Sequence, residues 1–133
     1  MKPTLPPRRS TFAYLWVAPV TLFGLVLALI VYWLGASVKR RFGVLEVAGN
    51  SRTTLLRKLS NQFDAITVGH VILGRNHGTL NRWRNHEHVH VRQYERWGVL
   101  FPALYVLASF KALLCGNRFY WDNVFEAQAR NRS

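Results

Sequence analysis

The sequence predicts an α+β fold in which an N-terminal transmembrane helix precedes one small domain. Three observations support this prediction. An uncharged apolar stretch near the N-terminus is long enough to cross a bilayer. Two runs rich in β-branched residues follow it, and beyond them apolar residues recur with the period of an α-helix. The chain has 133 residues, so the part beyond the apolar stretch is close to the lower size limit for an independent core.

The apolar stretch runs from Phe12 to Gly35, which gives 24 mostly apolar positions. A helix of about 20 apolar residues crosses the hydrocarbon core of a bilayer. We therefore expect a single span over residues 12–36, within an anchor region over residues 1–41. Aromatic side chains stand near both ends, as is typical of interfacial positions: Tyr14, Trp16, Tyr32 and Trp33. A cleaved signal peptide is the alternative, but its apolar region is ordinarily shorter, about 7–15 residues.

The net charge of +12 would point to nucleic acid in a soluble chain, but here much of it flanks apolar segments. We expect no nucleic-acid partner. Instead, we expect a basic belt suited to the anionic headgroups of membrane lipids: Lys39, Arg40, Arg41, Arg52, Arg57 and Lys58. Three basic residues precede the span and six follow it, which favours a cytoplasmic C-terminal domain.

The domain is expected to begin with a short β-hairpin. Residues 43–48 and 65–73 are rich in β-branched residues and are each bounded by glycine, so we expect them to pair as two strands. The segment between them, residues 49–63, is polar and basic and is expected to form a helix or a loop. Cys115 is the single cysteine, so an intramolecular disulfide is excluded.

A helical segment over residues 79–97 contains the pattern H-E-x-x-H. His86 and His90 are four residues apart, so both imidazoles lie on one face and can reach a single ion. Glu87 lies about 100° further round, where its carboxylate reaches water rather than the metal. His88 falls on the opposite, charged side and is expected to be exposed. The alternative is that the two histidines are ordinary core residues and that Glu87 pairs with an arginine.

A catalytic zinc needs a third protein ligand and an open position for water. Glu95 projects about 140° away from His90 on the same helix, so it is excluded as the third ligand. The other acidic candidates lie upstream, in or beside the predicted strands, or after the apolar residues 99–114: Glu46, Asp64, Asp122 and Glu126. That apolar run has 16 positions, so we expect a core or interfacial helix rather than a second span.

These segments together resemble the zincin superfamily of zinc metallopeptidases, and within it small gluzincin-like proteins whose third ligand is a glutamate on a later helix. The resemblance covers residues 43–129 and is carried by residues 65–73, 86–93 and 122–127. Residues 92–98, Arg-Gln-Tyr-Glu-Arg-Trp-Gly, look most similar to small bacterial membrane proteins. The resemblance implies a zincin-like domain over residues 42–133, with Zn²⁺ held by His86, His90 and Glu126. It also implies a bacterial inner-membrane location.

The resemblance further implies peptide hydrolysis. A zinc-activated water attacks the peptide bond, and Glu87 acts as the general base that passes its proton to the leaving amine. A polypeptide substrate would dock along a free strand edge over residues 66–72, including Ile66, Val68 and His70. A purely structural hairpin is an equal alternative. Gln93 is expected near the metal side, where it would orient a ligand.

Three alternatives stay open at this stage. The pattern Asn123-x-x-Glu126 also fits a helix start in which Glu126 reaches back to the backbone N–H of its cap. The site would be structural rather than catalytic if a fourth protein ligand such as His70 or His77 closed it. A vestigial zinc site or a basic lipid-binding adaptor would need no catalysis at all.

Overall fold

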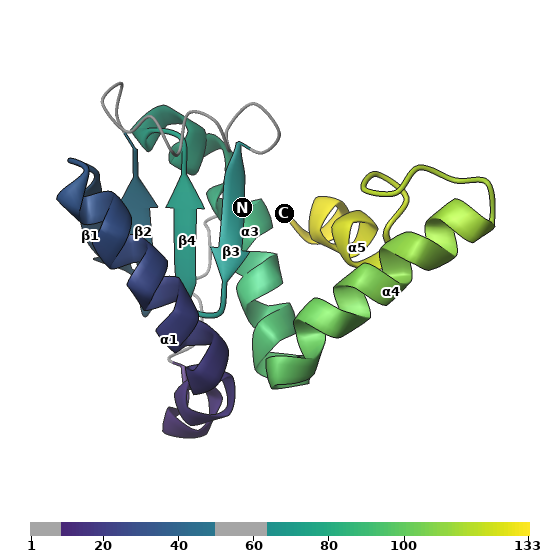
Figure 1. Ribbon diagram of the computed structural model, residues 1–133, viewed down its shortest axis with the longest axis horizontal. Helices are drawn as coiled ribbons and strands as arrows, with labels where there is room; N and C mark the ends of the chain where they lie inside the picture. The colour runs from purple at the N-terminus through teal and green to yellow at the C-terminus, as the bar shows by residue number, and fades with distance from the viewer. Residues whose placement is uncertain (1–8, 50–63) are drawn as a thin grey trace.

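A computed structural model describes residues 9–49 and 64–133 and shows an α+β fold built on a four-stranded sheet (Figure 1). One helix crosses the near face of the sheet, and a second lies behind it. The elements follow in this order: α1 (Thr11–Trp33), β1 (Ser37–Arg41), β2 (Val44–Ala48), β3 (Ala65–Val68), β4 (Val71–Gly74), α3 (His77–Trp97), a 3₁₀ turn η1 (Gly98–Leu100), α4 (Phe101–Leu114) and α5 (Val124–Arg132).

The predicted N-terminal apolar helix is confirmed as α1. It begins after Ser10, whose hydroxyl oxygen accepts a hydrogen bond from the Ala13 N–H at 3.2 Å. By length and composition, two helical segments are apolar enough to cross a membrane, Thr11–Trp33 and His77–Leu114. The first of them packs one face on the sheet, where Gly24 allows the closest approach. A Cβ added to Gly24 would lie 2.6 Å from the carbonyl oxygen of Val68.

The two predicted strand segments do pair, but in parallel through β2 and β4 rather than as the predicted hairpin. The run expected as one strand folds back on itself as the β3–β4 hairpin, because Gly69, with φ of 63°, makes a tight turn with His70. Residues 44–48 form a hairpin with β1 and pair in parallel with β4, which gives the order β1-β2-β4-β3. The sheet therefore begins at Ser37, inside the region expected to be an anchor. The expected helix or loop between the strands lies mostly outside the described residues, as do Arg52, Arg57 and Lys58.

The motif helix α3 packs on the face of the sheet opposite α1. Asn76 caps its start by accepting a hydrogen bond from the Thr79 N–H at 2.8 Å. Leu80 and Val91 join one core cluster with three residues of the sheet, Val44, Ala48 and Ile72. The expectation that His88 is exposed is wrong, since only 6% of it is accessible. The charged side of the helix faces the β1–β2 turn and the start of α1, so His88 contacts Phe42 and Arg9 instead of water.

Two further helices complete the described structure, in agreement with the prediction of an apolar helix and a terminal helix. α4 leaves the end of α3 at an angle, and α5 returns to lie against α3 (Figure 1). Asn123 joins the two helices, because its side-chain amide donates to the Ser109 hydroxyl at 2.7 Å and to the Tyr105 carbonyl at 3.0 Å. This return places the start of α5 beside the motif histidines.

Candidate metal centre

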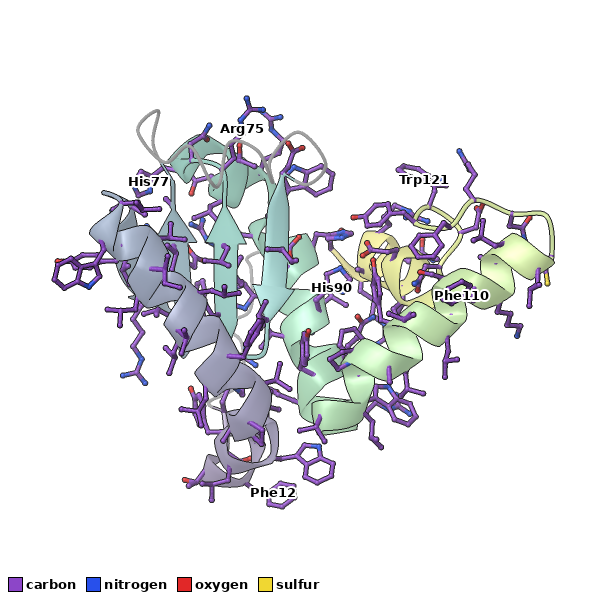
Figure 2. The ribbon with its side chains drawn as sticks, in the orientation of Figure 1. Phe12, Arg75, His77, His90, Phe110 and Trp121 are labelled. Carbon is purple, nitrogen blue, oxygen red and sulfur yellow. The ribbon has the colours of Figure 1, made fainter. Side chains whose placement is uncertain are left out.

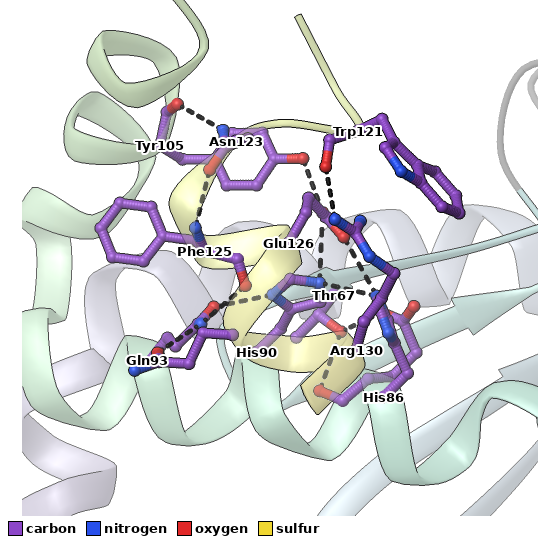
Figure 3. A network of polar contacts seen from close by, with 12 residues as sticks. Thr67, His86, His90, Gln93, Tyr105, Trp121, Asn123, Phe125, Glu126 and Arg130 are labelled. Atoms are coloured by element: carbon purple, nitrogen blue, oxygen red, sulfur yellow. Dashed lines mark hydrogen bonds and ion pairs between the residues drawn. The ribbon is translucent and has the colours of Figure 1, made fainter. Parts of the chain in front are cut away.

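His86, His90 and Glu126 converge on one point between α3 and α5 (Figure 3). The Nε2 atoms of the two histidines lie 3.2 Å apart. One carboxylate oxygen of Glu126 lies 3.1 Å from His86 Nε2, and the other lies 3.2 Å from His90 Nε2. All three residues are buried. The structure thus brings together three residues that the resemblance assigned to zinc.

These distances fit a single divalent ion. Two atoms that bind one zinc ion tetrahedrally, at about 2.0–2.2 Å each, lie roughly 3.3 Å or slightly more apart. The separation of 3.2 Å between the two histidine nitrogens is within a few tenths of an ångström of that value, and each nitrogen has a different oxygen of Glu126 at 3.1 or 3.2 Å. Imidazole nitrogen and carboxylate oxygen are also the usual donors of catalytic zinc sites. The residues present therefore fit the metal that the motif implies.

Gln93 sets the tautomer of His90. Its side-chain N–H₂ group donates to the Phe125 carbonyl at 3.0 Å and to the Gln128 side chain at 2.9 Å, which fixes the orientation of the amide. The amide oxygen of Gln93 consequently faces His90 Nδ1 at 2.8 Å, so Nδ1 is the protonated nitrogen. The lone pair of a neutral His90 then lies on Nε2, directed at the convergence point. The hydrogen bond between His90 Nδ1 and the Gln93 amide oxygen thus supports the expectation that Gln93 orients a ligand.

Glu126 is held by α4 as well as by its own helix. Asn123 caps α5, because its side-chain oxygen accepts a hydrogen bond from the Phe125 N–H at 2.9 Å. The Asn123 N–H bonds to the Tyr120 carbonyl at 3.2 Å, so the cap forms without the Glu126 carboxylate. The Tyr105 hydroxyl donates to Glu126 at 2.7 Å. Burial raises the pKa of Glu126, but the two histidines and Tyr105 outweigh it and hold the pKa well below its usual range.

Glu87 lies beside the convergence point and is hydrogen-bonded to the sheet. The Thr67 hydroxyl donates to Glu87 Oε2 at 2.6 Å. Burial raises the pKa of Glu87 above its usual value, although the positive charge of a protonated His90 and the Thr67 hydrogen bond oppose the shift. A carboxylate with a raised pKa next to a metal site suits a general base.

Glu87 is also close enough to be considered as a ligand. Candidate ligand atoms of His86, Glu87 and His90 all lie within 4.8 Å of one another. The two oxygens of Glu126 contact both histidines, and one of them also accepts a hydrogen bond from Tyr105, as a Glu87 oxygen does from Thr67.

A cleft of about 250 Å³ opens beside the site. Its lining combines the edge strand β3, the motif helix and the start of α4: Ala65, Ile66, Thr67, Glu87, His90, Tyr94, Phe101, Pro102, Tyr105, Val106, Tyr120 and Glu126. The lining is mostly apolar, and its acidic and histidine side chains are Glu87, Glu126 and His90. His90 lies on the side of α3 that faces α5 (Figure 2). The cleft is therefore lined by two residues of the candidate metal centre, His90 and Glu126, and by Glu87.

The predicted edge strand is only partly correct. β3 is an edge of the sheet, and its Ile66 is 45% exposed and lines the cleft. Val68 is on the same strand but is buried. His70 lies in the turn after β3, where its ring is hydrogen-bonded to Glu95 at 2.9 Å and lies 3.3 Å from the Thr21 hydroxyl. His70 is thus neither part of the edge nor close to the motif histidines.

Three other candidate ligands form hydrogen bonds elsewhere among the described residues. Glu46 accepts two hydrogen bonds from Arg84, at 2.8 and 3.0 Å. Asp122 bonds the Arg118 backbone N–H at 2.7 Å, and His77 bonds Ser37 at 2.7 Å. The group of metal-ligating side chains found within residues 9–49 and 64–133 is His86, Glu87 and His90, so neither His70 nor His77 closes the site as a fourth ligand.

Two contributors to the site carried no signal in the sequence. Thr67 looks like any strand residue, and Tyr105 belongs to an apolar run that predicted only a helix. Both act by contacts between distant segments, with 20 residues separating Thr67 from Glu87 and 21 separating Tyr105 from Glu126.

No family model, curated protein or solved structure matches this chain. The arguments for function therefore rest on the motif and on the geometry of the site.

Proposed function

We propose that this protein is a membrane-bound zinc peptidase of gluzincin type. In this proposal His86, His90 and Glu126 hold the metal, and Glu87 is the general base. The observation that carries the proposal is the position of Glu126, which is 40 residues from His86 in the chain yet contacts both motif histidines. A chance H-E-x-x-H helix has no reason to meet a buried carboxylate from a later helix at ligand distance.

The described residues divide the chemistry of peptide hydrolysis among themselves. A bound Zn²⁺ supplies a Lewis acid that lowers the pKa of water and polarises a carbonyl. Glu87, oriented by Thr67, accepts a proton from the attacking water and delivers it to the leaving amine. Gln93 and Tyr105 hold His90 and Glu126 in place.

The substrate class proposed is an extended polypeptide. Among residues 9–49 and 64–133, β3 pairs with a strand on one side only and lines the cleft, and a peptide can add to such an edge by backbone hydrogen bonds. The apolar walls from Ile66, Phe101 and Val106 favour an apolar side chain beside the bond that is cut.

The location proposed is a membrane, by the resemblance a bacterial inner membrane, with the site on its cytoplasmic side as the distribution of basic residues favours. Support comes from α1, which is uncharged and apolar over 23 residues. Anionic lipid headgroups are the proposed partners of the basic residues that follow α1.

Metal analysis of the purified full-length chain in detergent tests the ligand set. We expect about one zinc per wild-type chain and none in His86→Ala or Glu126→Ala, because a three-ligand site does not survive loss of a ligand. Asp122→Asn is the matched control: it removes an exposed acid four residues from Glu126 and is expected to keep its zinc. Full zinc in Glu126→Ala would show that the ligand assignment is wrong.

Hydrolysis of a mixture of quenched fluorescent peptides tests the chemistry separately. Glu87→Gln is expected to keep zinc and lose activity by about 10²- to 10⁴-fold, the usual contribution of a general base. Zinc binding without peptide cleavage by the wild-type chain would favour a structural site. Equal activity of Glu87→Gln and the wild type would show that Glu87 is not the general base.

A further inference from the structure

The outward face of α1 carries large apolar side chains along its whole length. Leu15, Leu22 and Leu29 recur every seven residues, so they form one stripe, and they are 69%, 62% and 58% exposed. No charged residue occurs anywhere in the helix. Figure 1 looks onto this face, and Figure 2 shows Phe12 projecting from the N-terminal end of α1. Soluble proteins rarely leave so long an apolar surface in water.

The inward face of the same helix is packed on the sheet. Val17, Ala28 and Val31 are buried, and the backbone at Gly24 approaches Val68 so closely that no side chain fits. The Thr21 hydroxyl accepts a hydrogen bond from the His70 N–H at 3.2 Å. α1 is therefore one layer of the domain, and its two faces need different partners.

Strand β1 runs back along α1 from one end to the other. It starts at Ser37, four residues after the helix ends, and its turn reaches the other end, where the Tyr14 hydroxyl donates to the Gly43 carbonyl at 2.9 Å. The three consecutive basic residues of β1 consequently lie at levels between the two ends of α1. All three are exposed: Lys39, Arg40 and Arg41.

This arrangement conflicts with a helix that stands perpendicular to the bilayer. A perpendicular α1 would carry β1 and the rest of the sheet into the hydrocarbon core. Open sheet edges do not occur in lipid, and exposed Lys and Arg side chains are costly there. A helix parallel to the surface would bury only its outward face and would keep the sheet in water.

We propose that α1 lies in the plane of the membrane interface and holds the domain on one leaflet, in place of the single span that its sequence predicts. Arg40 is the cation best placed to contact anionic headgroups. Arg40 is two residues after Val38, so the two side chains point to the same face of the sheet. Val38 packs with Ala28 and Val31 of α1, and Arg40 therefore lies on the side that α1 covers. Lys39 and Arg41 line a polar pocket with α3 on the other side.

A lipid leaflet fits this face better than a second copy of the chain. Protein interfaces carry about one hydrogen bond per 100–200 Å² and a polar rim. The outward face of α1 has no charge, and the side chains in its middle are hydrocarbon only, including Leu22, Phe23 and Val26. Interfacial aromatic side chains occur at both ends instead, at Trp16 and Trp33.

Depth measurement in vesicles tests the orientation. The full chain with Cys115→Ser receives a single cysteine at Leu15, Leu22 or Leu29, each carrying an environment-sensitive fluorophore. The vesicles contain phosphatidylcholine and phosphatidylglycerol, with spin-labelled lipids that quench at a shallow or a deep position. A cysteine in place of Arg82, which is exposed on α3, is the control and is expected to be quenched by neither lipid.

We expect the three labels on α1 to be quenched to the same extent, and several-fold more by the shallow quencher than by the deep one. A deepest position at Leu22, with Leu15 and Leu29 shallow, would show a span and overturn the proposal. Failure of the wild-type chain to float with the vesicles, together with a stable dimer in solution, would identify a second copy as the occupant. Neither outcome depends on zinc, so this test stands apart from that of the peptidase proposal.

Discussion

The Thr67 hydroxyl lies 2.6 Å from Glu87 Oε2 and so connects the edge strand of the sheet to the carboxylate beside the candidate metal centre. Thr67 also lines the cleft. An extended molecule docked on β3 would therefore lie beside the residue that orients the base, which couples binding at the edge to chemistry at the site.

Removing the Thr67 hydroxyl is expected to slow hydrolysis without releasing the metal. Thr67→Val keeps the shape of the side chain but leaves Glu87 without its hydrogen bond. We expect kcat to fall by about tenfold or more, with KM and zinc content little changed, because supporting contacts of this kind typically contribute 10- to 100-fold. Thr67→Ser retains the hydroxyl and should recover most of the rate, and equal losses in both variants would contradict an orienting role.

Loss of Gln93 is expected to weaken metal binding. Gln93→Leu removes the acceptor that keeps the proton of His90 on Nδ1, so the tautomer with a free Nε2 is no longer favoured. We expect the zinc affinity to fall by about 10- to 100-fold, measured by competition with a chelator. Gln128→Leu removes one of the two contacts of the Gln93 amino group, at 2.9 Å, and leaves the one to the Phe125 carbonyl, so it should bind zinc nearly as well as the wild type.

Glu46 is expected to make stability dependent on acid pH. Burial raises its pKa, but interactions with His88 and Arg84 outweigh burial and lower the pKa to about 2 from a reference of 4.5. A lowered pKa contributes stability above the unfolded value, and this contribution is lost as the pH falls from about 4.5 toward 2. It amounts to at most about 3 kcal/mol.

Urea unfolding of wild type and Glu46→Gln at several pH values measures this contribution. We expect the variant to be less stable at neutral pH and the difference to shrink steadily below pH 4.5. Asp122→Asn, at an acid paired with Arg118 on the surface, should unfold like the wild type at every pH. A difference for Glu46→Gln that persists at the lowest pH would have to come from packing rather than from charge.

Enlarging Gly24 is expected to separate α1 from the sheet. The new Cβ of Gly24→Ala would lie 2.6 Å from a backbone oxygen, which cannot move without shifting β3. Overpacking of this kind typically costs about 1–3 kcal/mol of unfolding free energy. Gly78→Ala is the matched control, because a Cβ there meets one atom at 3.4 Å within a helix, where alanine is favoured. Equal stability of the two variants would mean that α1 is not packed as described.

Local patterns predicted the elements that depend on residues close together in the chain. The motif helix, the apolar helix and α1 each have a composition or period that few other structures share, whereas the terminal helix was expected from the resemblance and from its capping pattern. The sheet was predicted only in part, because residues 65–73 form one apolar run and the backbone at Gly69 shows that the run reverses. Strand pairing joins segments that are far apart in the chain, so the sequence of one strand does not name its partner.

The candidate site was likewise predicted in part from local sequence and decided in part by packing. Spacing on one helix places His86 and His90 side by side, and this follows from helix geometry alone. The sequence by itself therefore determined a helix able to present two imidazoles and an apolar segment able to enter a membrane. Only the tertiary structure decided that Glu126 meets those imidazoles, that His88 is buried and that the sheet lies along α1. Each of these depends on how separate helices and strands pack, and packing is a property of the whole chain.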